Sequence, residues 1–189
     1  KTHLVPFGEY VPLKDQLPWM KVFTPYKHDY SCTPGDSLTR FELPARDGKT
    51  YTFGVLICYE DSDPYLARQY NPAAGKPGVD FLVNTSNDGW FDGTEEHEQH
   101  LAICRFRAVE ARRSVVRAVN MGISAAIDPD GRVIEWAAGP WGESKKVSGV
   151  VRAHVPVDDR ASPYAAAGDW VPAVCWGVIA VGLVVPVLR

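Results

Sequence analysis

The sequence predicts an α/β fold, in which strands alternate with helices and the last strands form a hairpin. Two observations support this prediction. Short apolar runs rich in β-branched residues recur along the chain, and one longer segment between them has apolar residues at helical spacing. Alternating strands and helices are typical of a sheet that helices cover. The chain has 189 residues, of which 46% are hydrophobic, so we expect about one domain with a sizeable core.

The first predicted strand covers residues 51–57, an apolar run that ends directly before Cys58. Residues 59–70 are expected to open a helix, because a proline stands early in this segment, where a helix tolerates it. Proline and glycine make 71–78 a loop. A second strand is predicted at 80–83, and polar residues follow it.

A longer helix is predicted to begin near Asp92, since Asp92 and Glu95 have the spacing of a capping box. Its glutamates come early and its arginines come late, which suits the helix dipole. An apolar stripe at helical spacing comprises Leu101, Cys104, Ala108 and Ala111. We therefore expect Cys104 to be a core residue and the arginines of 105–113 to lie on a solvated face.

Three more strands are predicted at 114–119, 123–127 and 132–136. The last two flank the segment 128–131, which reads Asp-Pro-Asp-Gly and is a strong hairpin turn. The series of strands therefore ends in a hairpin, which completes the predicted α/β arrangement.

The C-terminal stretch from Trp170 to Leu188 contains no charged residue over 19 residues, close to the roughly 20 that span a bilayer core. Tryptophans stand at its start, where an aromatic belt is found. A buried helix of a soluble protein is the alternative, but helices of soluble proteins normally have a polar face. We expect a domain at 1–168 and a transmembrane helix at 169–189, with Arg189 on the cytoplasmic side and the domain outside the cytoplasm.

Charge and composition exclude several classes of function. The net charge is −3 and the chain has no basic arm, so no nucleic-acid partner is expected. No two of the four cysteines have C-x-x-C spacing, and no structural disulfide is expected. His97 and His100 are one residue too close for the zinc-protease motif, so we expect a solvated or cleft-rim helix face there, no metal and no cofactor. The chain has no initiator methionine, and we expect it to be part of a longer protein.

Cys58 is the strongest candidate for chemistry, because a thiol at the end of a buried strand is held rigidly and the turn after it opens into a cleft. An ammonium nearby, such as that of Lys1, would lower the pKa of the thiol and stabilise an oxyanion. Glu9 and Glu60 are candidate general bases, but the sequence alone places neither of them in the cleft.

Several motifs occur together in one order. Residues 1–12 read Lys-Thr-His-Leu-Val-Pro-Phe-Gly-Glu-Tyr-Val-Pro. This segment resembles the lysine motif of nitrilase-superfamily enzymes, in the form that the motif has in the bacterial apolipoprotein N-acyltransferases. Ile57-Cys58-Tyr59-Glu60 resembles their nucleophile motif. Further blocks that resemble theirs are residues 85–91, 105–113, 120–124, 162–164 and 168–170. The resemblance covers essentially the whole chain, and the order of the motifs makes it specific.

The resemblance implies a nitrilase-like α-β-β-α sandwich, of which this chain is the C-terminal part, followed by one transmembrane helix. It implies that Cys58 is the nucleophile, that Lys1 is the lysine of the catalytic triad and that Glu9 is a supporting glutamate. The triad's glutamate base lies before the lysine motif in this family, so we expect the chain to be inactive alone. The residues expected to support or contact the substrate are Tyr59, Glu60, Trp90, Phe91 and His3. Trp90 and Phe91 are equally compatible with a core position, and His3 is compatible with simple packing.

The resemblance also implies the function. It implies that an acyl chain passes from a phospholipid such as phosphatidylethanolamine to the cysteine, and then to the α-amino group of a diacylglyceryl-cysteine on an apolipoprotein. The expected location is the bacterial inner membrane, with the catalytic domain on the periplasmic side. Two alternatives stay open, namely a nitrilase-superfamily amidase with a membrane anchor and a non-catalytic module tethered to the membrane.

Overall fold

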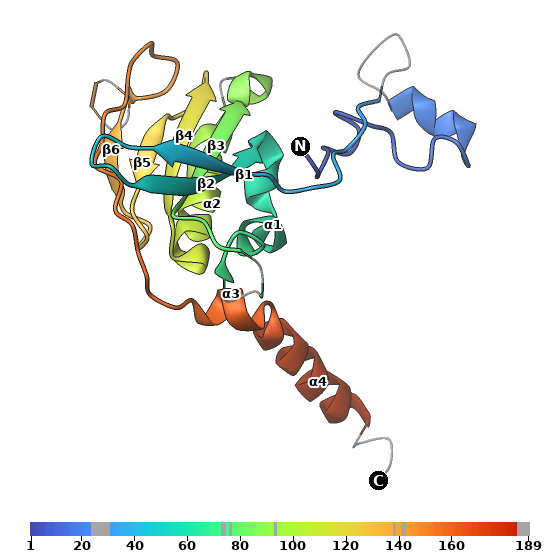
Figure 1. Ribbon diagram of the computed structural model, residues 1–189. Coiled ribbons are helices and arrows are strands. Elements are labelled where there is room, and N and C mark those ends of the chain that lie inside the picture. Colours follow the sequence, from blue (N-terminus) through green and yellow to red (C-terminus); the bar gives the residue numbers. More distant parts are fainter. Residues whose placement is uncertain are drawn as a thin grey trace.

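A computed structural model describes residues 1–23, 31–72, 75, 77–92, 94–137, 139–140 and 143–184. These residues contain a six-stranded mixed sheet with the order β1-β2-β3-β4-β5-β6 (Figure 1). The strands are β1 (Arg40–Pro44), β2 (Thr50–Ile57), β3 (Phe81–Asn87), β4 (Ser114–Asn120), β5 (Ala125–Ile127) and β6 (Val133–Trp136). Strands β2, β3 and β4 are parallel, and the other neighbours pair antiparallel.

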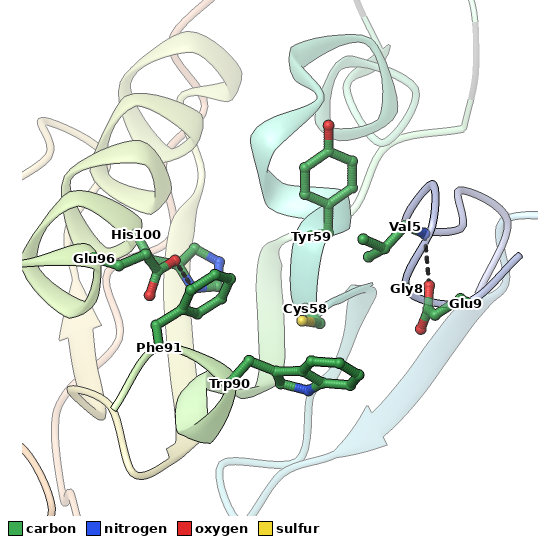
Figure 2. A pocket seen from close by; sticks show the side chains of 9 residues that line it. All are labelled: Val5, Gly8, Glu9, Cys58, Tyr59, Trp90, Phe91, Glu96 and His100. Carbon is green, nitrogen blue, oxygen red and sulfur yellow. Dashed lines mark hydrogen bonds and ion pairs between the residues drawn. The ribbon is translucent and has the colours of Figure 1, made fainter. Parts of the chain in front are cut away.

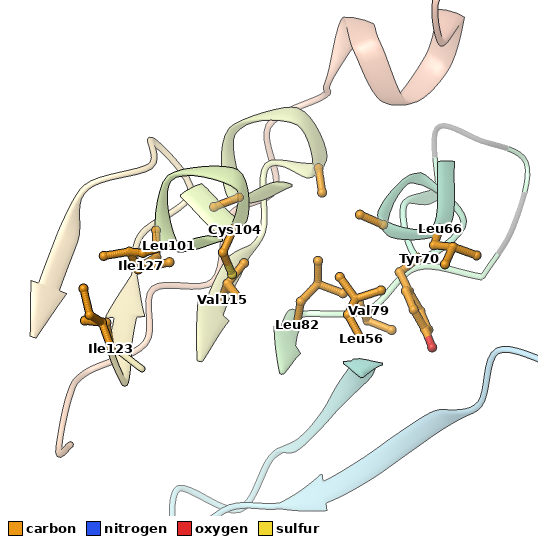
Figure 3. Close-up of a cluster of buried hydrophobic side chains, with 14 residues drawn as sticks. Leu56, Leu66, Tyr70, Val79, Leu82, Leu101, Cys104, Val115, Ile123 and Ile127 are labelled. Atoms are coloured by element: carbon orange, nitrogen blue, oxygen red, sulfur yellow. The ribbon is translucent and has the colours of Figure 1, made fainter. Parts of the chain in front are cut away.

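Helices and short 3-10 turns connect these strands. The α-helices are α1 (Pro64–Arg68), α2 (Glu96–Ala111), α3 (Pro163–Ala167) and α4 (Trp170–Val184). The 3-10 turns are η1 (Pro18–Phe23), η2 (Cys58–Ser62) and η4 (Asp88–Phe91). The hydrophobic core lies between the sheet and the helices α1 and α2 (Figure 3). Leu56, Leu82 and Val115 enter it from the three parallel strands, and Leu101 and Cys104 enter it from α2.

The opposite face of the sheet carries a ladder of aromatic rings. Phe41, Phe53 and Phe81 occupy paired positions on β1, β2 and β3, and their ring centroids lie 5.2 and 5.4 Å apart. Side chains alternate between the two faces of a strand, so the neighbours of these rings point to the helices. The described residues therefore form a helix layer on a sheet layer, and the rest of the expected α-β-β-α sandwich stays a prediction.

The predicted strands at 51–57, 114–119 and 132–136 are confirmed as β2, β4 and β6. The strand predicted at 80–83 continues to Asn87, because its polar end pairs with β4. The helix predicted at 59–70 is confirmed only for Pro64–Arg68, since the segment divides into η2 and α1. Asp63 between them is extended, with φ −96° and ψ 104°, and a residue before proline disfavours helical angles.

The helix predicted from Asp92 begins instead at Glu96. The expected capping box is wrong, because Glu95 is the N-cap residue and its side chain makes no capping hydrogen bond. The hydroxyl of Thr94 accepts a hydrogen bond from the Glu96 backbone N–H at 3.3 Å instead. Cys104 is fully buried, as predicted.

The solvated face predicted for the arginines is wrong for two of them. Arg107 and Arg113 are both buried. Arg113 donates hydrogen bonds to the backbone carbonyls of Val79 and Asp158, at 2.5 and 2.7 Å. Arg107 forms an ion pair with Glu110 at 2.8 Å. The guanidinium groups thus bind backbone carbonyls and a carboxylate where helix α2 meets other segments. The spacing of residues along the helix does not reveal these tertiary contacts.

Helix α4 projects away from the domain (Figure 1). The large apolar side chains between Trp170 and Leu183 are exposed. Among the described residues, no helix combines the length and the apolar character that crossing a membrane requires. The final part of the predicted span, residues 185–189, lies outside the described residues, and the domain boundary at 168/169 stays a prediction.

Candidate active site

A cavity of about 140 Å³ opens where the parallel strands β2 and β3 end (Figure 2). Its wall is formed by Val5, Gly8, Glu9, Cys58, Tyr59, Trp90, Phe91, Glu96 and His100. Five of these nine are predicted site residues, which the structure brings together from three separate segments. Glu96 and His100 come from helix α2, and sequence reasoning did not select them.

Cys58 stands at the first position of η2, directly after β2. Its φ angle is +54°, a left-handed conformation that costs a residue other than glycine roughly 1–2 kcal/mol. The side-chain amide of Asn84 donates hydrogen bonds to the carbonyls of Leu56, at 3.2 Å, and of Cys58, at 3.5 Å. Backbone strain of this kind persists where the surroundings enforce it, often at functional sites. The sharp turn places the thiol at the carboxyl edge of the sheet, facing the cavity (Figure 2).

Glu60 ties the N-terminal loop to this turn. Its carboxylate is 2% exposed and accepts hydrogen bonds from the backbone N–H groups of Thr2, His3 and Ile57, at 2.6, 3.0 and 2.8 Å. Burial alone would raise the pKa of Glu60, but these hydrogen bonds outweigh burial and the pKa is lowered. Glu60 is therefore an anion that fixes the segment around Lys1 beside the segment around Cys58.

Lys1 and Glu9 form an ion pair, with 2.6 Å between Lys1 Nζ and Glu9 Oε2. The same carboxylate oxygen accepts a hydrogen bond from the Val5 backbone N–H at 2.7 Å. Glu9 lies in the wall of the Cys58 cavity, whereas Lys1 lines the neighbouring hollow beside Ile57. Lys1 therefore does not itself line the cavity, and it contacts the cavity wall through its ion pair with Glu9.

Four buried charged side chains join the elements around the cavity. They are Asp61 on η2, Asp88 on η4, His100 on α2 and Arg117 on β4. Arg117 contacts the carboxylates of Asp61 and Asp88 at 3.0 and 2.9 Å. We call this set the charge cluster. Because Asp61 belongs to the turn of Cys58 and Asp88 to the turn of Trp90, the cluster connects two walls of the cavity.

His100 bridges the two carboxylates of the charge cluster. Its Nε2 lies 2.8 Å from Asp61 Oδ1, and its Nδ1 lies 2.9 Å from Asp88 Oδ1. A carboxylate only accepts hydrogen bonds, so both ring nitrogens must carry protons. Burial alone would lower the pKa of His100, but the bonds to Asp61 and Asp88 raise it to about 9. The cluster therefore holds two positive and two negative charges.

His3 does not lie in the cavity wall. Its side chain is more than half exposed and pairs with Asp63 at 2.7 Å. It lines a separate hollow together with Tyr10 and Cys32. All four cysteines of the chain are free, and Cys58 is the one that lines the cavity.

The prediction of a solvated or rim position is wrong for His97, which is 1% exposed, while His100 lines the cavity from a buried position. Asp88, Glu96 and His97 each offer a ligand atom, and these atoms lie within 4.8 Å of one another, close enough for a metal ion. Both oxygens of Asp88 are already engaged, by Ser86, His100 and Arg117. His100 and Arg117 therefore already neutralise part of the negative charge at this possible metal site.

One signal in the sequence points to the charge cluster. Arg117 stands in the middle of the run Val115-Val116-Arg117-Ala118-Val119, which reads as a buried strand. A charge in such a strand requires counter-ions, since an unpaired buried charge is very costly. The acidic residues that follow β2 and β3 are the natural candidates, because these strand ends lie at one edge of the sheet.

Residues 1–162 match the family model for carbon-nitrogen hydrolases, which is most of the chain. The chain belongs to the carbon-nitrogen hydrolase family. This carbon-nitrogen hydrolase is 33% identical over its whole length to the apolipoprotein N-acyltransferase of Chlorobaculum tepidum, of which it covers 34%. It is 39% identical to that of Geobacter metallireducens over 70% of the chain and 23% of the relative. The predicted resemblance is confirmed, and the chain spans about a quarter to a third of the length of these relatives.

Solved structures of carbon-nitrogen hydrolases are also similar to the chain. XC1258 from Xanthomonas campestris is 16% identical with a TM-score of 0.40, over 55% of this chain and 41% of XC1258. A Nesterenkonia amidase of the nitrilase superfamily is 19% identical with a TM-score of 0.42, over 56% of this chain and 39% of the amidase.

Proposed function

We propose that the protein transfers an acyl chain from a phospholipid to the α-amino group of a diacylglyceryl-cysteine on apolipoproteins, by way of a thioester on Cys58. The observation that carries the proposal is the strained Cys58 turn in a largely apolar cavity, with the Lys1–Glu9 ion pair at its edge. The relatives named apolipoprotein N-acyltransferase support the same activity for the whole protein.

In the first half-reaction the Cys58 thiolate attacks the carbonyl carbon of the phospholipid ester and a C–S bond forms. The Lys1 ammonium, held in place by Glu9, stabilises the negative charge on the carbonyl oxygen. The C–O bond then breaks, and the lysophospholipid leaves as an alcohol after taking up a proton. The glutamate base that the resemblance implies takes the thiol proton of Cys58 and passes it to the leaving alcohol. Because the chain covers only 34% and 23% of the two relatives, we propose that this base and the activity belong to a longer protein.

In the second half-reaction the neutral amine attacks the thioester carbon, an amide forms and the C–S bond breaks. Cys58 returns as the thiolate, and the protons of the original ammonium pass to solvent. Splitting the transfer into two steps suits a thioester, which amines attack readily. No metal or cofactor enters this scheme.

The acyl chain would lie against the aromatic side of the cavity. Tyr59, Trp90 and Phe91 line it and expose much of their rings. The exposed apolar side chains of α4 support anchorage of the domain at a bilayer, where both substrates are found. We propose the bacterial inner membrane as the location, with the catalytic domain outside the cytoplasm.

The test uses the longest natural form of the protein that contains these residues, with phosphatidylethanolamine vesicles and a diacylglyceryl-cysteine peptide. We expect the peptide to gain the mass of one acyl chain, and Cys58→Ala to abolish this gain. Hydrolysis of small amides without any transfer would instead favour an anchored amidase. If the protein catalyses neither acyl transfer nor amide hydrolysis, the result would favour a non-catalytic module.

A further inference from the structure

Glu96 carries a carboxylate that the proposed mechanism leaves unused. It lines the cavity from the first turn of α2, on the side of Cys58 that lies away from Val5 and Glu9 (Figure 2). Its Oε1 lies 3.8 Å from His100 Nδ1. Its Oε2 is shielded from solvent and has no hydrogen-bond partner among the described residues. A buried carboxylate oxygen without a donor is costly, so the site lacks a donor group.

The charges around Glu96 favour a cation in this place. The charge cluster next to it is balanced, since Asp61 and Asp88 offset His100 and Arg117. Glu96 therefore adds one negative charge that these groups do not compensate. Burial raises the pKa of Glu96, which is the response of a carboxylate in such a position.

His97 provides a second and independent sign of a missing ligand. The side chain is 1% exposed, and neither ring nitrogen has a hydrogen-bond partner within the part of the chain that the structure describes. One of its nitrogens lies within 4.8 Å of a carboxylate oxygen of Glu96 and of one of Asp88. A ring nitrogen of His97 that carries no proton accepts a hydrogen bond, so one donor group can serve both this nitrogen and the Glu96 oxygen.

We propose that Glu96 and His97 form a binding subsite for a primary ammonium group. An ammonium carries donors for both residues, and its single charge balances the uncompensated charge of Glu96. A divalent metal ion would leave a surplus positive charge beside His100 and Arg117. The Glu96 oxygen becomes accessible when its carboxylate turns about the last side-chain bond, a soft rotation.

The subsite deepens the proposed function and rests on it. The acceptor of the acyl chain is an α-amino group, which is mostly protonated at neutral pH because its ordinary pKa is about 7.7–8.0. A carboxylate in the wall of the Cys58 cavity would hold this ammonium close to the thioester. Glu96 and His97 thereby select a cationic acceptor over an uncharged nucleophile.

The experiment compares Glu96→Gln with the control Glu98→Gln in the longest natural form of the protein. Glu98 lies on the same helical turn, but it pairs with Lys145 and does not line the cavity. The thioester is first formed with phosphatidylethanolamine and then discharged with the diacylglyceryl-cysteine peptide or with hydroxylamine, an uncharged nucleophile at neutral pH. We expect E96Q to slow discharge by the peptide about tenfold more than discharge by hydroxylamine, and E98Q to affect both equally.

Equal slowing of the two discharges by E96Q would overturn the subsite while leaving the proposed function in place. If no thioester forms at all, the proposed function fails, and the subsite is judged by binding. In that case S-alkyl cysteine amide, the probe, should bind the protein at least tenfold more weakly after E96Q and unchanged after E98Q. Stoichiometric binding of Zn²⁺ that E96Q and H97A abolish, without binding of the amine, would overturn the ammonium subsite.

Discussion

The carboxylate of Asp61 lies 3.0 Å from the guanidinium of Arg117, and both side chains are fully buried. Asp61 belongs to the turn that Cys58 begins, and Arg117 also contacts Asp88 in the turn that carries Trp90. A single guanidinium thus joins two walls of the cavity. The position of the candidate nucleophile therefore depends on a charge in the interior of the sheet.

Replacing Arg117 by methionine should destabilise the protein strongly. The variant leaves Asp61 and Asp88 buried with only His100 as a cationic partner, and breaking a buried ion pair from one side costs about 3–5 kcal/mol. Urea unfolding measures the change. Arg132→Met is the control, because Arg132 is exposed and its ion pairs are long. A free energy of unfolding within 1 kcal/mol of wild type for R117M would contradict the role of the cluster.

Glu60→Gln should cost about 1.5–3 kcal/mol of unfolding free energy, since hydrogen bonds to a charged acceptor contribute roughly that much. The pKa of Glu60 is lowered in the folded protein, so its contribution is present above the unfolded pKa of about 4.3 and is lost as the pH falls through the folded value. Unfolding followed between pH 7 and pH 3 should show a steeper acid loss for wild type than for E60Q. Parallel curves would mean that Glu60 does not hold the loop.

His100 should remain a cation well above neutral pH. Its folded pKa of about 9 exceeds the unfolded value of about 6.5, so its stabilisation is complete below pH 6.5 and is lost as the pH rises through 9. We expect its imidazole resonances to titrate near pH 9 in NMR spectra, and stability to fall between pH 7 and 10 less steeply in His100→Gln. Titration near pH 6.5 would show that the two carboxylates do not bind it as described.

Cys58→Gly should be more stable than Cys58→Ala by about 1 kcal/mol, because only glycine adopts the left-handed angle of this position without strain. Thermal unfolding of the two variants tests this difference. The same pair at Cys32 serves as the control, since Cys32 does not have a positive φ and glycine should be the less stable variant there. An equal or lower stability of C58G would show that the turn stores no strain.

Local patterns in the sequence predicted much of the fold. They include the apolar runs of β2 and β4 and the apolar stripe of α2. Such patterns can be recognised in the sequence because buried positions recur at regular intervals along a single strand or helix. Strand β1 was missed for the opposite reason. Four of its five residues are exposed and it ends in proline, so only its pairing with β2 defines it.

The candidate site divides in the same way. Cys58, Glu9, Tyr59, Trp90 and Phe91 were predicted from their motifs, and the structure gathers them around one cavity. The charge cluster was missed because the partners of Arg117 lie 56 and 29 residues away in the chain. Acidic and basic residues are normally expected to be exposed to solvent. Only the tertiary fold brings the four residues of the charge cluster together in one buried place.

The most direct test of Cys58 as the nucleophile is the intact mass of the longest natural form of the protein after incubation with phosphatidylethanolamine. We predict an added mass of one acyl chain, located on Cys58 by peptide mapping, absent in Cys58→Ala and released by hydroxylamine as a thioester would be. An adduct that persists in Cys58→Ala, or transfer to the peptide without any adduct on Cys58, would contradict the proposed mechanism.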